Sequence, residues 1–256
     1  MKPTSLFIVV CIAIVCFVAS CSQEKIQGID VPDERNDAQS PFGADTPGEA
    51  HNYLLNQCMV YADSVGISHY LDANCDLDWN TLTADFDSIL VAAAAKQYSI
   101  NVTSLMLDSV HEAFGSTLYA THVDSVFQPN CDSWGNAATC IDALGLSTNQ
   151  ETVWLNFISD VKTEPGKLDD LIEDVLDNHS DDTVLYVSFD ILEHSLDFWA
   201  TYSRNRYSVG EGVADAVGGI LGGAAGGIFT GVAAGVFASW FYGQIEKYQL
   251  NQGQEG

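Results

Sequence analysis

The sequence predicts an all-α fold, a helical bundle with a C-terminal glycine-zipper (GxxxG) helix or helical hairpin. Three observations support this prediction. Apolar residues recur at helical spacing from residue 47 onward, helix-start signals precede several of these segments, and glycines recur at every fourth position near the C-terminus. The chain shows neither an internal repeat nor an alternation of strand and helix patterns, which argues against an α/β fold.

The glycine ladder is the most regular pattern in the chain. It comprises Gly219, Gly223, Gly227, Gly231 and Gly235, and a second row of small residues runs beside it. Residues four apart share one face of a helix, and a face without side chains lets another helix backbone come close. Glycine costs about 1 kcal/mol per residue relative to alanine inside a helix, so such a run needs close packing to compensate. We therefore expect these five glycines to be helix-packing residues.

Three arrangements of the ladder remain open. Residues 216–242 contain no charged side chain and are long enough to cross a bilayer, although glycine and alanine dilute their large apolar side chains. The segment can contact a membrane or self-associate through its small-residue face. It can instead be a core helix of the bundle, or bend at Gly222-Gly223 or Gly226-Gly227 into a helical hairpin.

The first 20 residues have the pattern of a lipoprotein signal peptide. A basic residue and a short apolar run open the chain, and Val18, Ala19 and Ser20 directly precede Cys21, as in a bacterial lipobox. Two or more acyl chains on one cysteine anchor a protein stably to a bilayer. We therefore expect lipidation of Cys21 and a lipid-anchored protein of the bacterial cell envelope, at the outer membrane.

The mature chain divides by composition. The lipidated cysteine is followed by a polar segment with Pro and Gly, which is typical of a flexible tether. The expected organisation is a tether over 21–46, an acidic helical domain over 47–205, the hydrophobic zipper helix over 206–249 and a polar tail over 250–256.

Local signals place the helices of the domain. Thr46 and Glu49 form a capping box around Pro47, where the domain begins. Apolar stripes predict further helices at 79–98 and 101–114, and short ones near 119–127 and 137–144. A second capping box, Thr148 to Glu151, opens a helix that Pro165-Gly166 ends. The next helix follows directly, and Asp181 or Asp182 caps the last one, whose residues 184–189 are also rich in strand formers.

Charge and cysteine content narrow the function. Nine basic residues against 35 acidic ones give a net charge of −26, which argues against nucleic acid as a partner because phosphates require clustered Lys and Arg. Besides Cys21, four cysteines follow the signal peptide, and in an oxidising compartment they predict two disulfides. Three connectivities are open, with two local pairs as the simplest solution; the candidates are Cys58, Cys75, Cys131 and Cys140.

The sequence predicts neither an enzyme nor a metal or cofactor site. It lacks the HExxH, G-x-S-x-G, P-loop and dinucleotide-binding motifs, and its six histidines have no metal-ligand spacing. Asp72 to Asp78 is similar to the start of an EF-hand loop, but Leu77 and Thr83 stand where the loop requires Gly and Glu. We expect the histidines to be structural or on the surface.

Three patterns occur together: the lipobox ending at Cys21, a Gly-x-x-His-Asn motif at Gly48, His51 and Asn52, and the zipper from Asp215 onward. In this combination the chain resembles uncharacterised lipoproteins of Bacteroidota-type bacteria. The resemblance covers both ends of the chain and implies an envelope location without a known activity. The His-Asn pair falls in the first turn of a capped helix, where local capping is a sufficient explanation.

The expected function is that of an exported lipoprotein anchored through Cys21, with the zipper segment mediating helix–helix or membrane association. Its expected partners are the lipid bilayer and, through the zipper, a second copy of the chain. Two alternatives remain. One is a bacteriocin-like or pore-forming toxin precursor, and the other is a soluble binding module with the zipper helix in its core.

Overall fold

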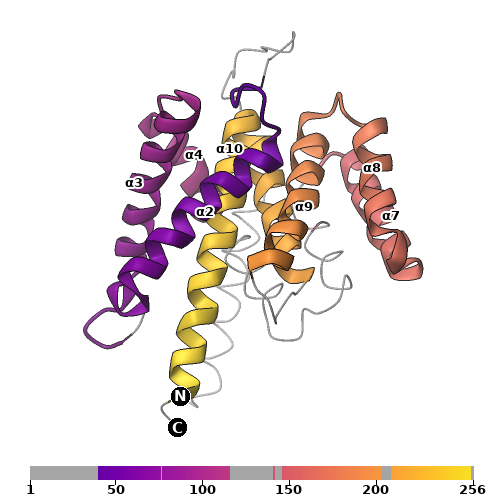
Figure 1. Cartoon of the computed structure of the whole chain (residues 1–256). Coiled ribbons are helices and arrows are strands. Elements are labelled where there is room, and N and C mark those ends of the chain that lie inside the picture. Colours follow the sequence, from indigo (N-terminus) through magenta and orange to yellow (C-terminus); the bar gives the residue numbers. More distant parts are fainter. Residues whose placement is uncertain (1–39, 76, 116–140, 142–145, 203–208, 255–256) are drawn as a thin grey trace, which may run out of the picture. The chain divides into compact units, whose positions relative to one another are not determined.

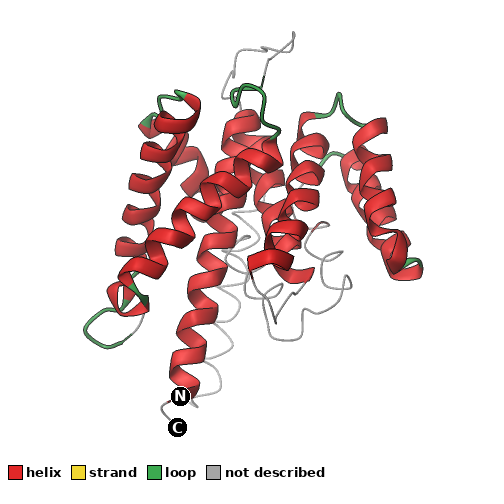
Figure 2. Ribbon diagram, viewed as in Figure 1, coloured by secondary structure: helices red, strands yellow, loops and turns green. Residues whose placement is uncertain are grey.

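The structure is a computed structural model that describes residues 40–75, 77–115, 141, 146–202 and 209–254. Within these residues, the regular elements are all helices, packed as a bundle (Figure 2). In chain order they are α2 (Pro47–Val65), η1 (Ile67–Tyr70), α3 (Trp79–Tyr98), α4 (Ser104–Gly115), α7 (Thr148–Thr163), η2 (Pro165–Lys167), α8 (Leu168–Asn178), α9 (Thr183–Tyr202) and α10 (Val209–Gln254). The all-α prediction is confirmed. The helix predicted at 119–127 lies outside the described residues, as does most of the one at 137–144.

The start of α2 follows the predicted capping box. The hydroxyl of Thr46 accepts a hydrogen bond from the backbone N–H of Glu49, and the Glu49 carboxylate accepts one from the backbone N–H of Thr46. Pro47 occupies the first turn, where its missing N–H leaves no hydrogen bond unmade. These local interactions fix the point at which the domain begins.

The capping box of α7 lies one residue before the predicted position. Ser147 is the N-cap, and Gln150 closes the box in place of Glu151. The register is set by a tertiary contact, because the Gln150 side chain also donates to both carboxylate oxygens of Asp182 at 3.0 Å. Asp182 in turn caps α9 by accepting from the N–H of Val184 at 3.0 Å, so the starts of the two helices are joined.

Helix α9 lies between two apolar cores. Its first turns contain residues 184–189, which are rich in strand formers, yet they are helical and buried on both faces. Val187 and Ile191 face a core formed with α2, α3 and α10, whereas Phe189 and Leu192 face a second core formed with α7 and α8. Burial on both faces outweighs the modest strand preference of the individual residues.

Helix α10 is interrupted at a single residue. Gly227 has φ 79° and ψ −164°, so α10 consists of two helical arms that meet there. This backbone conformation is essentially restricted to glycine because a Cβ would clash with the neighbouring peptide. The bend lies at one of the two glycine pairs at which the sequence left a hairpin open.

The two arms of α10 approach each other backbone to backbone. A Cβ added to Gly218 would lie 2.8 Å from the Cα of Gly235, and one added to Gly222 would lie 2.2 Å from the carbonyl oxygen of Thr230. Residues near the bend pair with residues near the bend, and residues far from it pair with residues far from it. The arms are therefore antiparallel, and α10 is called the glycine hairpin below.

The five predicted packing glycines all belong to this hairpin. Gly227 forms the bend, and Gly235 lies at the contact just described. A Cβ on Gly231 would lie 3.0 Å from the carbonyl oxygen of Gly219 and 3.1 Å from the backbone nitrogen of Gly223. The small-residue rows thus pack against each other within one chain.

The glycine hairpin occupies the middle of the bundle. It packs most extensively on α9 and also on α2 and α4 (Figure 1). Its second arm contributes large buried side chains to the core, namely Phe229, Val232, Val236, Phe237 and Trp240. Across the described part of the chain, no helix combines the length and the apolar character that a membrane crossing requires.

Replacing Gly222 by Ala should destabilise the fold by about 1–3 kcal/mol, since the new methyl group would meet a backbone carbonyl that cannot move aside. Gly223→Ala is the matched control. Its Cβ would meet nothing closer than 3.9 Å, and alanine favours a helix by about 1 kcal/mol over glycine. Urea unfolding of both variants measures the difference. Equal stabilities would show that the arms do not approach each other at Gly222.

Candidate functional site

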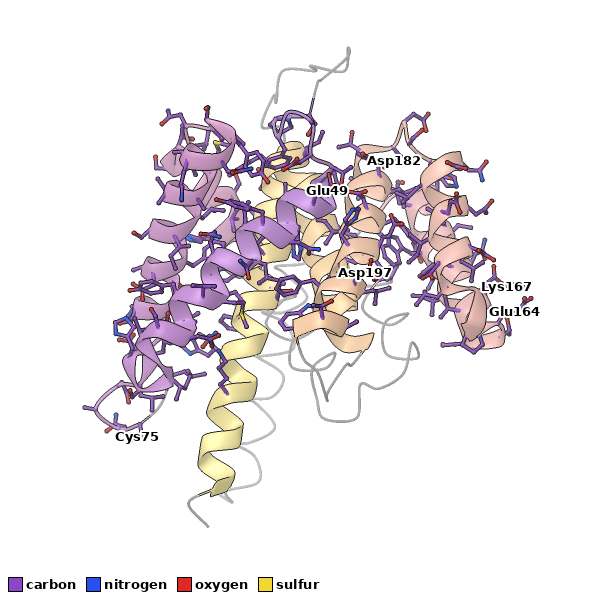
Figure 3. All side chains as sticks on the ribbon, in the orientation of Figure 1. Glu49, Cys75, Glu164, Lys167, Asp182 and Asp197 are labelled. Atoms are coloured by element: carbon purple, nitrogen blue, oxygen red, sulfur yellow. The ribbon has the colours of Figure 1, made fainter. Side chains whose placement is uncertain are left out.

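The cysteines predicted as lipid or disulfide sites lie mostly outside the described residues, which contain Cys58 and Cys75 but not Cys21, Cys131 or Cys140. Cys58 and Cys75 are both free thiols, so the local pair between them is not formed in the structure. Cys58 is buried on α2, where burial raises the pKa of its thiol. Cys75 is exposed in the loop before α3 (Figure 3). The disulfide and lipidation sites therefore stay predictions.

The loop that is similar to an EF-hand uses two of its carboxylates for local structure. Asp72 accepts a hydrogen bond from the backbone N–H of Asn74 at 2.7 Å, which closes a turn. Asp78 caps α3 by accepting from the N–H of Asn80 and from the hydroxyl of Thr81, and these bonds lower the pKa of its carboxyl. Asp72 and Asp78 thus have structural roles, in the turn and in the cap of α3.

The residues of the Gly-x-x-His-Asn motif lie where α2, α9 and α10 meet. Gly48, in the first turn of α2, donates its backbone N–H to the carboxylate of Asp190 on α9 at 2.5 Å. A Cβ on Gly48 would lie 2.3 Å from the backbone oxygen of Asp190 and 2.5 Å from Nδ1 of His194. Only a glycine lets the two helices come this close, and the carboxylate is stabilised at the positive end of α2.

The next two motif residues extend the same contact. Nδ2 of Asn52 donates to the backbone oxygen of His194 at 2.7 Å, which directs the Asn52 carbonyl toward Nδ1 of His51 at 3.0 Å. His51 therefore donates from Nδ1. Its ring is fully buried and also interacts with the backbone of Gly235 on α10. The Gly-x-x-His-Asn motif thus joins three helices, and local capping is not its role.

Burial controls the ionisation of this junction, which we define as Gly48, His51, Asn52, Asp190, His194 and Gly235. Burial lowers the pKa of His51 to about 4, and its hydrogen bonds to Asn52 and to the Gly235 backbone offset this only in part. Burial also raises the pKa of Asp190, against the opposing effects of the Gly48 N–H and of His194. The junction therefore favours a neutral imidazole at His51.

Glu193 lies at the open edge of the junction. Its side chain is largely exposed. The burial of its remaining part, together with the nearby Asp190 and Asp197, raises the pKa of its carboxyl, whereas His194 lowers it. One ligand-capable atom from each of Asp190, Glu193 and His194 lies within 4.8 Å of the others, a spacing that a divalent cation can bridge.

Two of these three groups already have protein partners. Asp190 accepts from Gly48, and Nδ1 of His194 donates to the Asp190 backbone oxygen at 2.9 Å. The contact with α2 accounts for the Asp190 carboxylate, and a bond within α9 accounts for Nδ1 of His194. Nδ1 of His194 also lies 3.8 Å from a carboxylate oxygen of Asp190, where His194 is half-buried and Asp190 is buried.

Sequence reasoning singled out the motif on α2 but not its partners on α9. Asp190 and His194 are four residues apart and Glu193 three from Asp190, a spacing that places all three on one helix face. That spacing was the available signal. The pairing of this face with Gly48 spans 142 positions along the chain, and no local pattern contains it. Comparisons with protein families, curated proteins and solved structures find no match to this chain.

Gly48→Ala should lower the free energy of unfolding by about 1–3 kcal/mol, because the methyl group would overlap the α9 backbone. Gly166→Ala is the control, since a Cβ there meets nothing within 4 Å. Thermal unfolding followed by circular dichroism compares the two. If Gly48→Ala proved as stable as the control, the close contact between α2 and α9 would be refuted.

Proposed function

We propose that the chain is an exported lipoprotein, held to a bilayer through Cys21, whose helical part is a binding module built around the glycine hairpin. The lipobox residues support the anchor. The observation that carries the rest of the proposal is that the small-residue rows of α10 are engaged with each other, at Gly218 with Gly235 and at Gly222 with Thr230.

This packing favours an internal role for the zipper. A small-residue face that drives association between chains, or between helices in a bilayer, has to be free for its partner. Here each arm of the hairpin fills the face of the other, and α9 and α2 cover much of what remains. Under the proposal, lipid on Cys21 supplies the membrane attachment, and the hairpin supplies the core.

The charge of the module limits what it binds. A net charge of −26 opposes contact with nucleic acid and with anionic lipid head groups. It also keeps the module soluble beside the membrane to which the lipid holds it. We therefore propose neutral or basic partners in the envelope.

A Cys21→Ala variant, exported behind a cleavable signal without a lipobox, tests the proposal. We expect the parent chain to remain with the membranes after a carbonate wash and the variant to be soluble and monomeric. Cys75→Ala, which removes an exposed thiol and leaves Cys21 in place, should stay on the membrane.

Retention of Cys21→Ala on the membrane would contradict the proposal and show that the hairpin contacts lipid. In that case, leakage of dye-loaded vesicles would separate a pore-forming role from simple assembly. A soluble oligomer would instead support association between chains through the zipper.

A further inference from the structure

His51 is an ionisable group of the junction that lies against the glycine hairpin itself. Its ring contacts the backbone of Gly235, and a Cβ added to Gly218 of the other arm would lie 2.8 Å from the Cα of Gly235. The imidazole is fully buried, and Nδ1 already donates to Asn52. A proton added to the ring would place a charge in the middle of the contact between α2 and the hairpin, where water cannot solvate it.

We propose that the junction is an acid-sensitive latch: proton uptake by His51 releases the N-terminal half of α2 from the glycine hairpin and from α9. Asn52 belongs to the same latch, because its amide links the His51 ring to the His194 backbone. This inference concerns the folded module alone and does not depend on lipidation of Cys21.

The described ionisable groups around His51 come from two elements. Glu49 lies beside it on α2, and residues 228–241 of α10 contain no ionisable side chain. Four more groups face the junction from α9, namely Tyr186, Asp190, Glu193 and His194. Of these, His194 acts directly on His51, and charge repulsion between the two rings lowers the pKa of His51.

The contributions of these groups to stability change with pH in opposite directions. The pKa of His51 is lowered on folding, so its contribution to stability is present above pH 6.5 and is lost as the pH falls toward about 4. The carboxyl pKa values of Asp190 and Glu193 are raised, so their contributions are larger in acid and are lost as the pH rises. Acid therefore removes the cost of burying charge at these two carboxyl groups and creates a buried charge at His51, and a His51 variant separates the two effects.

Hydrogen exchange on the full chain carrying Cys21→Ala tests the latch. If His51 alone titrated, the population of the open form, in which α2 is released from the hairpin, would rise about 30-fold between about pH 7.5 and about pH 5. Because the carboxyl groups act in the opposite direction, we expect protection factors over residues 48–60 and 228–240 to fall by about tenfold. Those of α7 and α8, which do not contact His51, should stay within about twofold.

His51→Asn, which keeps a donor toward Asn52, should lose most of this fall, and His179→Gln, at a half-buried site outside the junction, should keep it. An undiminished fall in His51→Asn, or none in the parent chain, would overturn the latch. If His51→Asn does not fold, NMR titration of the parent's histidine rings decides instead. The latch requires the His51 ring to titrate well below the ordinary imidazole value of 6.5 and together with the loss of hairpin protection; a midpoint near 6.5 would overturn it.

Discussion

The fold depends on the approach of two helix backbones at Gly218 and Gly222. A carbonyl oxygen or Cα occupies the place where any other residue would carry a Cβ, so the arms of α10 can meet at this distance only through glycine. The bend at Gly227 needs glycine for a different reason, its positive φ. Many glycines weaken each arm as an isolated helix, so the hairpin is stable only when packed. The surrounding helices provide that packing, and α9 provides most of it. Helix α9 is itself held between two apolar cores, both of which include residues of the hairpin.

The junction at the start of α2 repeats this principle on a smaller scale. Gly48 brings a helix N-terminus against the backbone of α9, and a buried carboxylate receives its N–H. His51 and Asn52 extend the contact to Gly235 of the hairpin and to His194 of α9. The absence of a side chain at glycine permits the helices to come close, and a few polar groups fix the register of their contact. A buried neutral imidazole at such a point couples the packing of the hairpin to proton concentration.

Local chemistry made much of the fold predictable. The capping box at Thr46, the helix over 79–98 and the break at Pro165 all rest on interactions between residues a few positions apart. The cap of α7 was misplaced by one residue because Ser147 and Thr148 are both favourable caps, and the contact of Gln150 with the distant Asp182 favours the first. The junction was not predictable for the same reason, since its partners are far apart in sequence. Composition indicated the close packing of the ladder but did not indicate whether its partner is a membrane helix, a second copy or the same chain.

The most direct test of the central claim is an isotope-filtered NOE measurement on a mixture of labelled and unlabelled chains, each carrying Cys21→Ala. If the arms pack within one chain, we expect a strong NOE between the Hα protons of Gly218 and Gly235 in the uniformly labelled sample, and none between labelled and unlabelled chains. An NOE between chains would show that the glycine rows join two molecules. The absence of any contact between Gly218 and Gly235 would show that the hairpin does not form.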